Sequence, residues 1–349
     1  MKRRIKLGNI EIGEGLPTLM IAEIGLNHNG SIELAREMIK AAALSGANMV
    51  KFQKRCPENL AISSFLDAPF LKCPLFGSTQ REVRNKLELN YEQIKELKRY
   101  SEELGLLFSM SVFDNESLKI AQKLNLQVIK LASHSATNAP LLEEIAKLNV
   151  PVILSMGGCT WKEKDKAFNI LKDIPLAILH CISAYPCPES LIKLDTINEL
   201  KKRYNVVVGY SGHENGIDIS VAASVIGASI IERHFTLNRS MVGLDHKISL
   251  HPSEFSNMVS SIRTIEKSRG LVEGIAQEEI ASRENYHVAV CTKKDMKKGD
   301  IIKLDDIVCK QPLGKLGENF SGFEISEVVG KELLIDLNRD VTISKKYVK

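Results

Sequence analysis

The sequence lacks the features that would indicate a membrane protein, a secreted protein or a nucleic-acid-binding protein. Its 349 residues include no apolar run of about eighteen residues, the length that a membrane-spanning helix needs. Residues 1–4 are basic, but an alternating pattern follows in place of an apolar segment, so we predict no signal peptide. The formal net charge is only +4, which gives no bulk attraction to nucleic acid or to a membrane surface.

Cysteine and glycine patterns argue against two further classes of protein. The seven cysteines are odd in number and include no Cys-x-x-Cys pair, so a disulfide framework is not expected. This usage fits a reducing compartment, and we predict a cytoplasmic protein. No Gly-x-Gly-x-x-Gly motif opens the first predicted helix, which argues against a dinucleotide-binding, doubly wound sheet.

The chain does contain a repeating unit, made of a short apolar strand, a polar loop and an amphipathic helix. The predicted strands are 19–24, 49–53, 106–112, 128–132, 152–155, 176–181, 206–211 and 230–235. The predicted helices are 32–44, 91–104, 116–124, 140–148, 161–171, 195–203, 217–226 and 252–267, and Asp114 and Asn138 are predicted caps. Eight such units predict an α/β fold, a (β/α)8 TIM barrel, with an open doubly wound sheet as the alternative.

Two segments of the predicted barrel fall outside the repeat. A small hairpin is predicted at 6–13, before the first barrel strand. The segment 54–90 is too long for a plain loop, so we expect it to be functional or to carry short elements of its own.

After residue 268 the strands become short and turns become frequent, at 298–300, 313–315 and 337–340. We therefore predict a barrel domain over 1–268, a linker over 269–285 and a small, mostly β domain over 286–349. A domain of this size buries only a modest core, so we expect it to pack on another surface.

The segment 230–236 has the pattern of a buried strand but contains Glu232, Arg233 and His234. Charged groups in a buried strand are costly unless they are paired or bound, so this strand should end in a polar pocket. The preceding predicted strand runs into His213 in the same way. Two histidines at the ends of separate strands are natural ligands for one divalent metal ion, with ordinary core or surface histidines as the alternative. The other histidines of the barrel segment are His28, His134, His180, His246 and His251.

Lys51 and Lys130 each interrupt an apolar strand. Lysine is rarely buried, so these positions indicate a bound anion or a Schiff base, and lysines whose charged ends reach solvent are the alternative. Small hydroxyls lie at the same predicted strand ends, at Ser111, Ser133, Ser155, Ser183 and Ser211. Together with two lysines they would suit a phosphate and a carboxylate.

Glu23 ends the first predicted barrel strand, where its carboxylate could bind metal, act as a general acid or base, or pair with a lysine. Asp245 is a similar candidate in the loop after the last strand, and Tyr185 precedes a proline in the loop after the sixth strand.

Taken together, these motifs resemble the sialic acid synthase family, which makes nonulosonic acids from phosphoenolpyruvate and an N-acylated amino sugar. The resemblance covers nearly the whole chain. It is carried by AEIGLNHNG at 22–30, VKFQ at 50–53, IKLAS at 129–133, LHC at 179–181, YP at 185–186, SGH at 211–213, ERHFT at 232–236 and DHK at 245–247. The tail resembles the antifreeze-like (SAF) domain of those synthases, with DMKKGD at 295–300 and VGK at 329–331.

The resemblance implies a phosphate-releasing transferase and a homodimer in which each tail domain covers the partner's site. It also implies a divalent metal, Mn²⁺ first and Mg²⁺ or Co²⁺ as alternatives, held by His213 and His234. The residues implied to hold phosphoenolpyruvate are Lys51, Ser111, Lys130, Ser133, Ser155, Ser183 and Ser211. Those implied to face the sugar or the reacting centre are Glu23, Gln53, Tyr185 and Asp245.

Three positions differ from the N-acetylneuraminate synthases of that family. Ser135, Ser183 and Gln311 stand where those enzymes carry an acidic residue, an asparagine and an arginine that contacts the sugar. We therefore expect a legionaminate- or pseudaminate-type precursor as readily as N-acetylmannosamine. A Schiff-base aldolase using Lys51 or Lys130 and a non-catalytic carbohydrate-binding protein are the rival functions.

Overall fold

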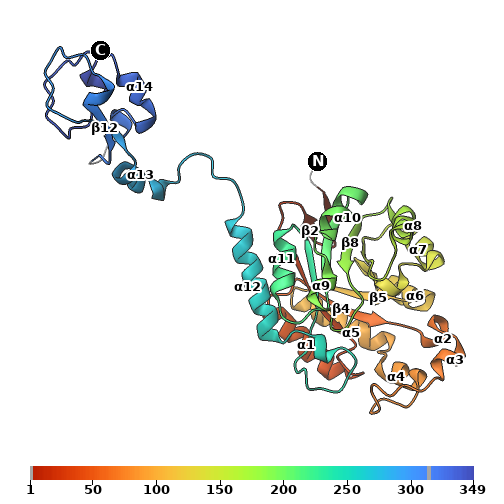
Figure 1. Ribbon diagram of the computed structural model, residues 1–349. Coiled ribbons are helices and arrows are strands. Elements are labelled where there is room, and N and C mark those ends of the chain that lie inside the picture. Colours follow the sequence, from red (N-terminus) through yellow and green to blue (C-terminus); the bar gives the residue numbers. More distant parts are fainter. Residues whose placement is uncertain (1–2, 313–315) are drawn as a thin grey trace. The chain divides into compact units, whose positions relative to one another are not determined.

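Eight short apolar strands pair in parallel and close into a barrel, in the order β10-β3-β4-β5-β6-β7-β8-β9 (Figure 1). The computed structural model describes residues 3–312 and 316–349, which form two compact units, Met1–Arg269 and Gly270–Lys349. The barrel strands are β3 (Leu19–Gly25), β4 (Met49–Lys54), β5 (Leu107–Val112), β6 (Ile129–Leu131), β7 (Val152–Ser155), β8 (Leu176–Cys181), β9 (Val207–Gly212) and β10 (Ile230–His234). The predicted (β/α)8 TIM barrel is confirmed, and each strand lies within two residues of its predicted bounds.

A hairpin closes the N-terminal end of the barrel. Its strands are β1 (Arg4–Leu7) and β2 (Ile10–Gly13), and Leu7 and Ile12 are fully buried against residues that begin the barrel strands, such as Leu19. This end of the barrel interior is therefore apolar, and polar side chains inside the barrel are left to the C-terminal ends of the strands.

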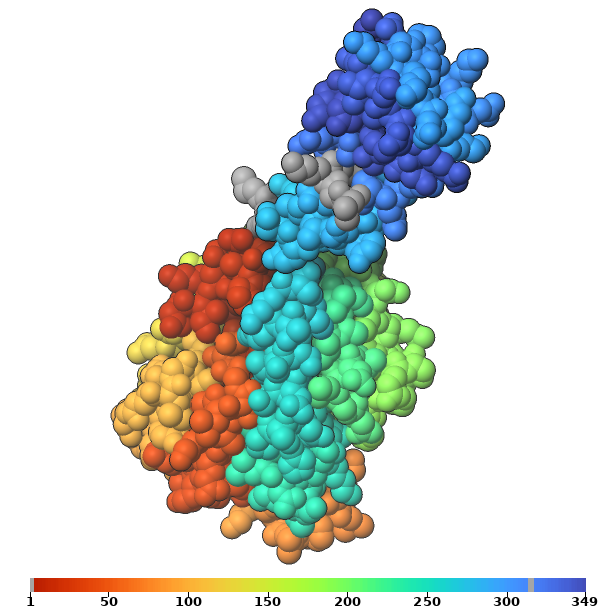
Figure 2. All heavy atoms as spheres, turned by 90° about the vertical axis from the view of Figure 1, so that its left-hand side faces the viewer, coloured from red at the N-terminus to blue at the C-terminus, as the bar shows by residue number. Residues whose placement is uncertain are grey.

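Amphipathic helices cover the outside of the barrel, because alternate strand residues point outward and carry apolar side chains there. The helices are α1 (Ile32–Leu44), α5 (Tyr91–Glu103), α6 (Asn115–Lys123), α7 (Ala139–Ala146), α8 (Trp161–Leu171), α10 (Thr196–Tyr204), α11 (Asp218–Val225) and α12 (Pro252–Ser268). Figure 2 shows α12 lying between α1 and α11, so the last helix of the barrel unit packs beside the first. The predicted caps are confirmed, since Asp114 and Asn138 accept bonds from the first turns of α6 and α7.

The long segment after β4 carries short elements of its own, as expected. These are α2 (Pro57–Leu60), α3 (Ser63–Leu66) and α4 (Gln80–Leu87). Val83 and Leu87 of α4 pack with Leu26 and Cys73 in a small separate core. A further short helix, α9 (Glu189–Ile192), follows β8.

The second unit has its own small core, which includes Val290, Ile302 and Leu333. It contains α13 (Ile280–Tyr286), the antiparallel pair β11 (Ala289–Thr292) and β12 (Ile307–Lys310), α14 (Ile325–Val328) and several isolated β-bridges. The predicted turn at 313–315 lies outside the described residues. Over 3–312 and 316–349, none of the helices combines the length and apolarity needed to cross a membrane.

Candidate active site

Lys51 and Lys130 are both buried among polar groups inside the barrel. Lys51 Nζ lies 2.8 Å from Glu23 Oε1 and donates to Ser111 Oγ at 2.9 Å. Lys130 Nζ donates to Ser155 Oγ at 2.7 Å. Neither lysine is a solvent-reaching surface lysine, so two ammonium groups stand at one end of the barrel interior.

Glu232 connects the two lysines. Its Oε2 lies 3.9 Å from Lys51 Nζ, and its Oε1 lies 3.7 Å from Lys130 Nζ and accepts from Ser211 Oγ at 2.9 Å. Burial opposes the charge of this carboxylate, but Lys130 and Lys51 outweigh burial and lower its pKa to about 2. Glu232 Oε2 is buried and has no hydrogen-bond partner, so Lys51 compensates its charge without a hydrogen bond.

The electrostatics of the two lysines differ. Burial disfavours the charge of Lys51, yet Glu23 and Glu232 more than compensate and raise its pKa. For Lys130 burial dominates and lowers the pKa, although Glu232 acts in the opposite direction. Lys51 is therefore held as a cation, and Lys130 depends on a neighbouring anion for its charge.

Glu23, at the end of β3, is the ionisable group poised near neutral pH. Burial raises its pKa to about 7, although the charge of Lys51 lowers it. Gln53 Nε2 donates to Glu23 Oε1 at 2.9 Å, while Glu23 Oε2 is buried without a partner. A carboxyl group in this state can accept or deliver a proton at working pH.

The serines divide into two groups around this charge cluster. Ser111, Ser155 and Ser211 are buried and already bonded to a lysine or to Glu232. Ser133 and Ser183 lie around Gly157: its N–H donates to Ser133 Oγ at 2.8 Å, and a methyl group there would come within 2.6 Å of Ser183 Oγ and 3.0 Å of Ser133 Oγ. Because Gly157 has no side chain, both hydroxyls approach it closely and lie on either side of one small space.

His213 and His234 lie together at the same end of the barrel, with ring centroids 5.4 Å apart. Burial lowers their pKa values to about 4 and about 3, respectively, so both imidazoles are neutral at pH 7. His213 Nδ1 lies 2.8 Å from the carbonyl of Ile182, which fixes that nitrogen as the donor and leaves Nε2 with a lone pair.

Tyr185 and Asp245 border the histidines. The Tyr185 ring lies 4.1 Å from the His213 ring. Asp245 Oδ2 is 3.9 Å from His234 Nδ1, too far for a hydrogen bond, and that nitrogen is buried without a partner. Across 3–312 and 316–349, no three histidine, cysteine or acidic side chains are arranged to hold one metal ion. The two histidines would therefore supply two protein nitrogens to a bound ion.

Other candidates lie elsewhere. His180 Nε2 lies 2.5 Å from the Ile192 carbonyl and the ring packs near Tyr210, so this histidine faces the helices. His134 is exposed, and Ser135 donates to the Val112 carbonyl. Gln311 belongs to the second unit, where its Nε2 donates to the Tyr286 carbonyl at 3.4 Å.

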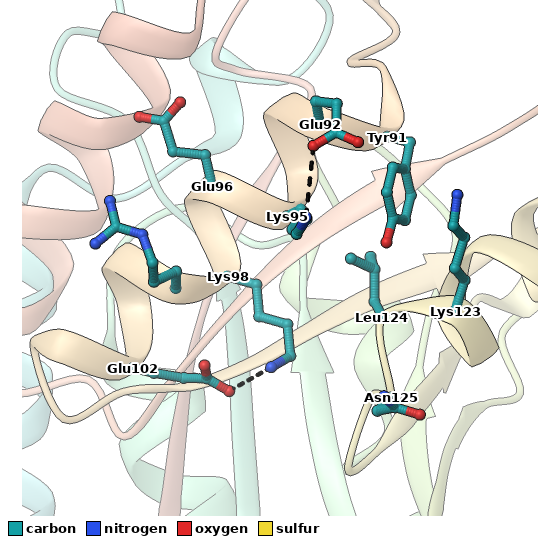
Figure 3. A pocket seen from close by; sticks show the side chains of 10 residues that line it. Tyr91, Glu92, Lys95, Glu96, Lys98, Glu102, Lys123, Leu124 and Asn125 are labelled. Carbon is teal, nitrogen blue, oxygen red and sulfur yellow. Dashed lines mark hydrogen bonds and ion pairs between the residues drawn. The ribbon is translucent and has the colours of Figure 1, made fainter.

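A surface hollow of about 550 Å³ lies on the outer helices, lined by α5 and the end of α6 (Figure 3). Charged side chains that line it form surface ion pairs, Lys98 with Glu102 along α5 at 2.6 Å and Glu96 with Arg36 of α1 at 2.7 Å. It contains none of the strand-end residues described above, so it is not the candidate active site.

A family model matches most of the chain. Residues 38–273 match the NeuB family, and residues 287–349 match the SAF domain. The chain belongs to the NeuB family. The resemblance to the sialic acid synthases is thereby confirmed, together with the SAF domain of the tail.

Named relatives of this NeuB family member span nearly its whole length. It is 37% identical to the N,N'-diacetyllegionaminic acid synthase of Campylobacter jejuni, over 90% of this chain and 95% of the relative. It is 34% identical to the human N-acetylneuraminate-9-phosphate synthase, over 97% and 94%. A crystal structure of the N-acetylneuraminic acid synthetase from Leptospira borgpetersenii, in complex with citrate, is 36% identical, has a TM-score of 0.71 and covers 81% of this chain and 97% of its own.

Two residues of this NeuB site were not among those predicted. Glu232 was recognised only as a charge in a buried strand, although its spacing of two from His234 placed both side chains on one face. Gly157 carries no side-chain signal at all, and only the approach of Ser133 and Ser183 reveals its role.

Proposed function

We propose that the chain is a nonulosonic acid synthase that condenses phosphoenolpyruvate with an N-acylated amino sugar and releases phosphate. The observation that carries the proposal is the pair of buried lysines, Lys51 and Lys130, at the end of the barrel where the paired histidines lie. The synthase names of the NeuB relatives support the same class of reaction.

The anion site is proposed to bind phosphoenolpyruvate. The carboxylate and phosphate of phosphoenolpyruvate would replace water around the two ammonium groups and the serine hydroxyls. Charge-assisted hydrogen bonds of this kind are strongest in a buried site. The cradle at Gly157 would admit phosphate oxygens close to Ser133 and Ser183. An incoming anion would also support the charge of Lys130, whose pKa is lowered by burial.

A divalent cation, Mn²⁺ first, is proposed to bind His213 and His234. Two features fit it: both imidazoles are neutral, and His234 Nδ1 is a buried atom that lacks a partner. Such an ion, when bound, would act as a Lewis acid on the open-chain sugar aldehyde.

In the proposed reaction, carbon 3 of phosphoenolpyruvate forms a bond to the aldehyde carbon, whose oxygen becomes a hydroxyl. Water adds to the cation left at carbon 2, and phosphate leaves with cleavage of its C–O bond. Lys51 and Lys130 stabilise the anionic groups throughout. Glu23, with a pKa raised to about 7, is suited to transfer one of the protons.

The sugar is proposed to be read by Gln53, Tyr185 and Asp245 of the barrel and by Gln311 of the SAF domain of a second copy. This places the reaction in a homodimer with exchanged tail domains, as the family resemblance implies. A lid of this kind would keep water away from phosphoenolpyruvate until the sugar has bound.

The test is phosphate release from phosphoenolpyruvate with a panel of N-acylated hexosamines, including N-acetylmannosamine and 2,4-diacetamido-6-deoxy sugars. We expect release only when a sugar is present, loss of turnover on chelation and recovery with Mn²⁺. A His213→Ala, His234→Ala double variant that keeps full activity would remove the metal assignment. Absence of release with every sugar would remove the synthase assignment.

The lowered pKa of Lys130 favours a second candidate, a Schiff-base aldolase, because a neutral amine is nucleophilic. Treatment with borohydride in the presence of phosphoenolpyruvate and sugar decides between the two. We expect mass spectrometry to find Lys51 and Lys130 unmodified. A reduced adduct on either lysine would establish the aldolase.

A further inference from the structure

Arg233 points to the opposite face of β10 from Glu232 and His234, as the alternation of a strand requires. There it forms a fully buried ion pair with Glu214, Nη1 to Oε1, at 2.7 Å, with both side chains 0% exposed. Nη1 also donates to the Gly216 carbonyl at 2.8 Å, and Nη2 donates to the Glu214 carbonyl at 2.5 Å. One guanidinium thus binds both the side chain and the backbone of the loop after β9.

Glu214 is held from three sides. Its Oε2 accepts from Tyr210 OH at 2.7 Å, and its Oε1 accepts from Ser220 Oγ at 2.9 Å as well as from Arg233. A methyl group at Gly212 would collide with Glu214 Oε2, so the glycine lets this side chain fold back over its own strand. The loop after β9 is therefore fixed to β10 and to α11 by a network of short hydrogen bonds.

The network is connected to the two histidines by the backbone, because its charged residues are their neighbours in sequence. Glu214 directly follows His213, and Arg233 directly precedes His234. Replacing a buried ion pair by apolar residues of the same volume is often neutral or stabilising, so net stability alone is a weak reason for this pair. The ion pair instead fixes the distance and orientation between the ends of β9 and β10, which carry His213 and His234.

We propose that Arg233 and Glu214 are positioning residues that hold His213 and His234 at the separation required by a shared divalent cation. The proposal rests on the metal site put forward above. His213 has a second anchor, since its carbonyl accepts from Cys187 N–H at 2.9 Å and its Nδ1 meets the Ile182 carbonyl. Loss of the pair should therefore weaken metal binding without abolishing it.

The experiment measures Mn²⁺ binding by the full-length protein, using electron paramagnetic resonance of free Mn²⁺, together with thermal unfolding and phosphoenolpyruvate binding. Arg233→Lys nearly keeps the side-chain volume but loses the second guanidinium nitrogen, which binds the Glu214 carbonyl, and Glu214→Gln keeps the volume but loses the charge. We expect each variant to bind Mn²⁺ about tenfold more weakly, the lower end of the effect of residues that orient metal ligands. Phosphoenolpyruvate binding should be unchanged, because Lys51 and Lys130 belong to other strands and Glu232 points to the opposite face of β10 from Arg233.

Two further variants keep the test decisive. Ser220→Ala removes one hydroxyl that bonds both members of the pair, and serves if the larger changes prevent folding. Arg203→Lys is the matched control, because Arg203 pairs with Asp165 through two bonds on the surface between α8 and α10. Its Mn²⁺ affinity should equal that of the unaltered protein.

The outcomes separate this inference from the proposed function. If the unaltered protein binds no Mn²⁺ that depends on His213 and His234, the proposed metal site itself is wrong. If it does bind, but the folded variants of Arg233, Glu214 and Ser220 melt at lower temperature with unchanged affinity, the pair is only structural. Weaker Mn²⁺ binding at a temperature where the variants are fully folded supports positioning.

Discussion

At the scale of the residue, burial decides which side chains of the site carry charge. It raises the pKa of Glu23 to about 7 and lowers that of His213 to about 4. Where opposite charges are close they reverse this effect, as the lysines do for Glu232. The charge of each side chain in this site therefore depends on its burial and on the charges around it, and not on residue type alone.

Glu232→Gln should make phosphoenolpyruvate binding depend on pH. Glu232 is the main group that supports the charge of Lys130, so its loss lowers the pKa of that lysine further. The charged lysine is proposed to bind the anion, so affinity should fall more steeply with rising pH in the variant than in the unaltered protein, by up to about tenfold. Isothermal titration calorimetry at several pH values measures this.

The matched control is Glu144→Gln, since Glu144 pairs with Lys147 on the surface. It should reproduce the unaltered profile. A profile for Glu232→Gln that is no steeper than that of the unaltered protein would mean that Lys130 keeps its charge without the carboxylate.

His28→Gln should flatten the dependence of stability on pH. Burial lowers the pKa of His28 from 6.5 to about 4. Between these values the unfolded chain binds a proton that the folded chain does not, so this stability is complete above pH 6.5 and is lost as pH falls toward 4. Comparing pH 7 with pH 4.5, we expect the variant to lose about 2 kcal/mol less than the unaltered protein.

Denaturant unfolding at the two pH values measures the difference in free energy of unfolding. His134→Gln is the control, because that histidine is exposed. An equal loss in His28→Gln and in the unaltered protein would show that other groups carry the acid sensitivity.

At the scale of the element, the two ends of the barrel strands carry different kinds of side chain. Residues that begin the strands pack with the β1–β2 hairpin, and residues near their ends carry the lysines, serines and histidines. The loops that follow then add backbone groups, such as the N–H of Gly157 after β7. A rigid strand and a short loop together set the positions of donors better than either alone.

Gly157→Ala should weaken phosphoenolpyruvate binding and little else. The added methyl group would lie 2.6 Å from Ser183 Oγ and fill the cradle between the two hydroxyls. We expect the KM for phosphoenolpyruvate to rise about tenfold, the loss of one charge-assisted hydrogen bond. The KM for the sugar and the affinity for Mn²⁺ serve as internal controls. An unchanged KM for phosphoenolpyruvate would show that its phosphate binds elsewhere.

At the scale of the whole molecule, the chain is built from two units with separate hydrophobic cores. The barrel unit, Met1–Arg269, contains the strand-end site, and the second unit contains the SAF domain and Gln311. Independent cores mean that the barrel can be tested without the tail, and that the tail can be altered without disturbing the barrel.

A chain shortened to end at Arg269 should fold but lose most of its synthase activity. Its core is complete, so we expect a cooperative melting transition, while the proposed sugar contact and lid are missing. Thermal melting and phosphate release with phosphoenolpyruvate and sugar measure the two properties. Normal turnover by the shortened chain would exclude the tail from the site.

Gln311→Arg should shift the preference toward N-acetylmannosamine, because a charged fork replaces one amide. Gln277→Arg, a change of the same kind in the exposed linker, is the control. Equal sugar profiles for both variants would show that position 311 does not read the substrate.

The sequence by itself determined the barrel, because apolar periodicity is local and the strand–helix unit recurs eight times. It also indicated the strand-end layer, since a parallel barrel gathers all strand ends at one rim. The placement of Lys51, Lys130, His213 and His234 near one another follows from that topology alone.

Only the tertiary structure decided how these groups pair. Glu232 stands between Lys51 and Lys130 because β10, β4 and β6 face one another across a closed barrel, and no spacing along the chain encodes distances across it. Arg233 meets Glu214 on the outer face because β10 pairs with β9, the strand that Glu214 follows. The local sequence pattern determines which residues lie at the strand ends. Closure of the barrel determines which of them become partners, because side-chain pairing depends on distance in space and not on separation along the chain.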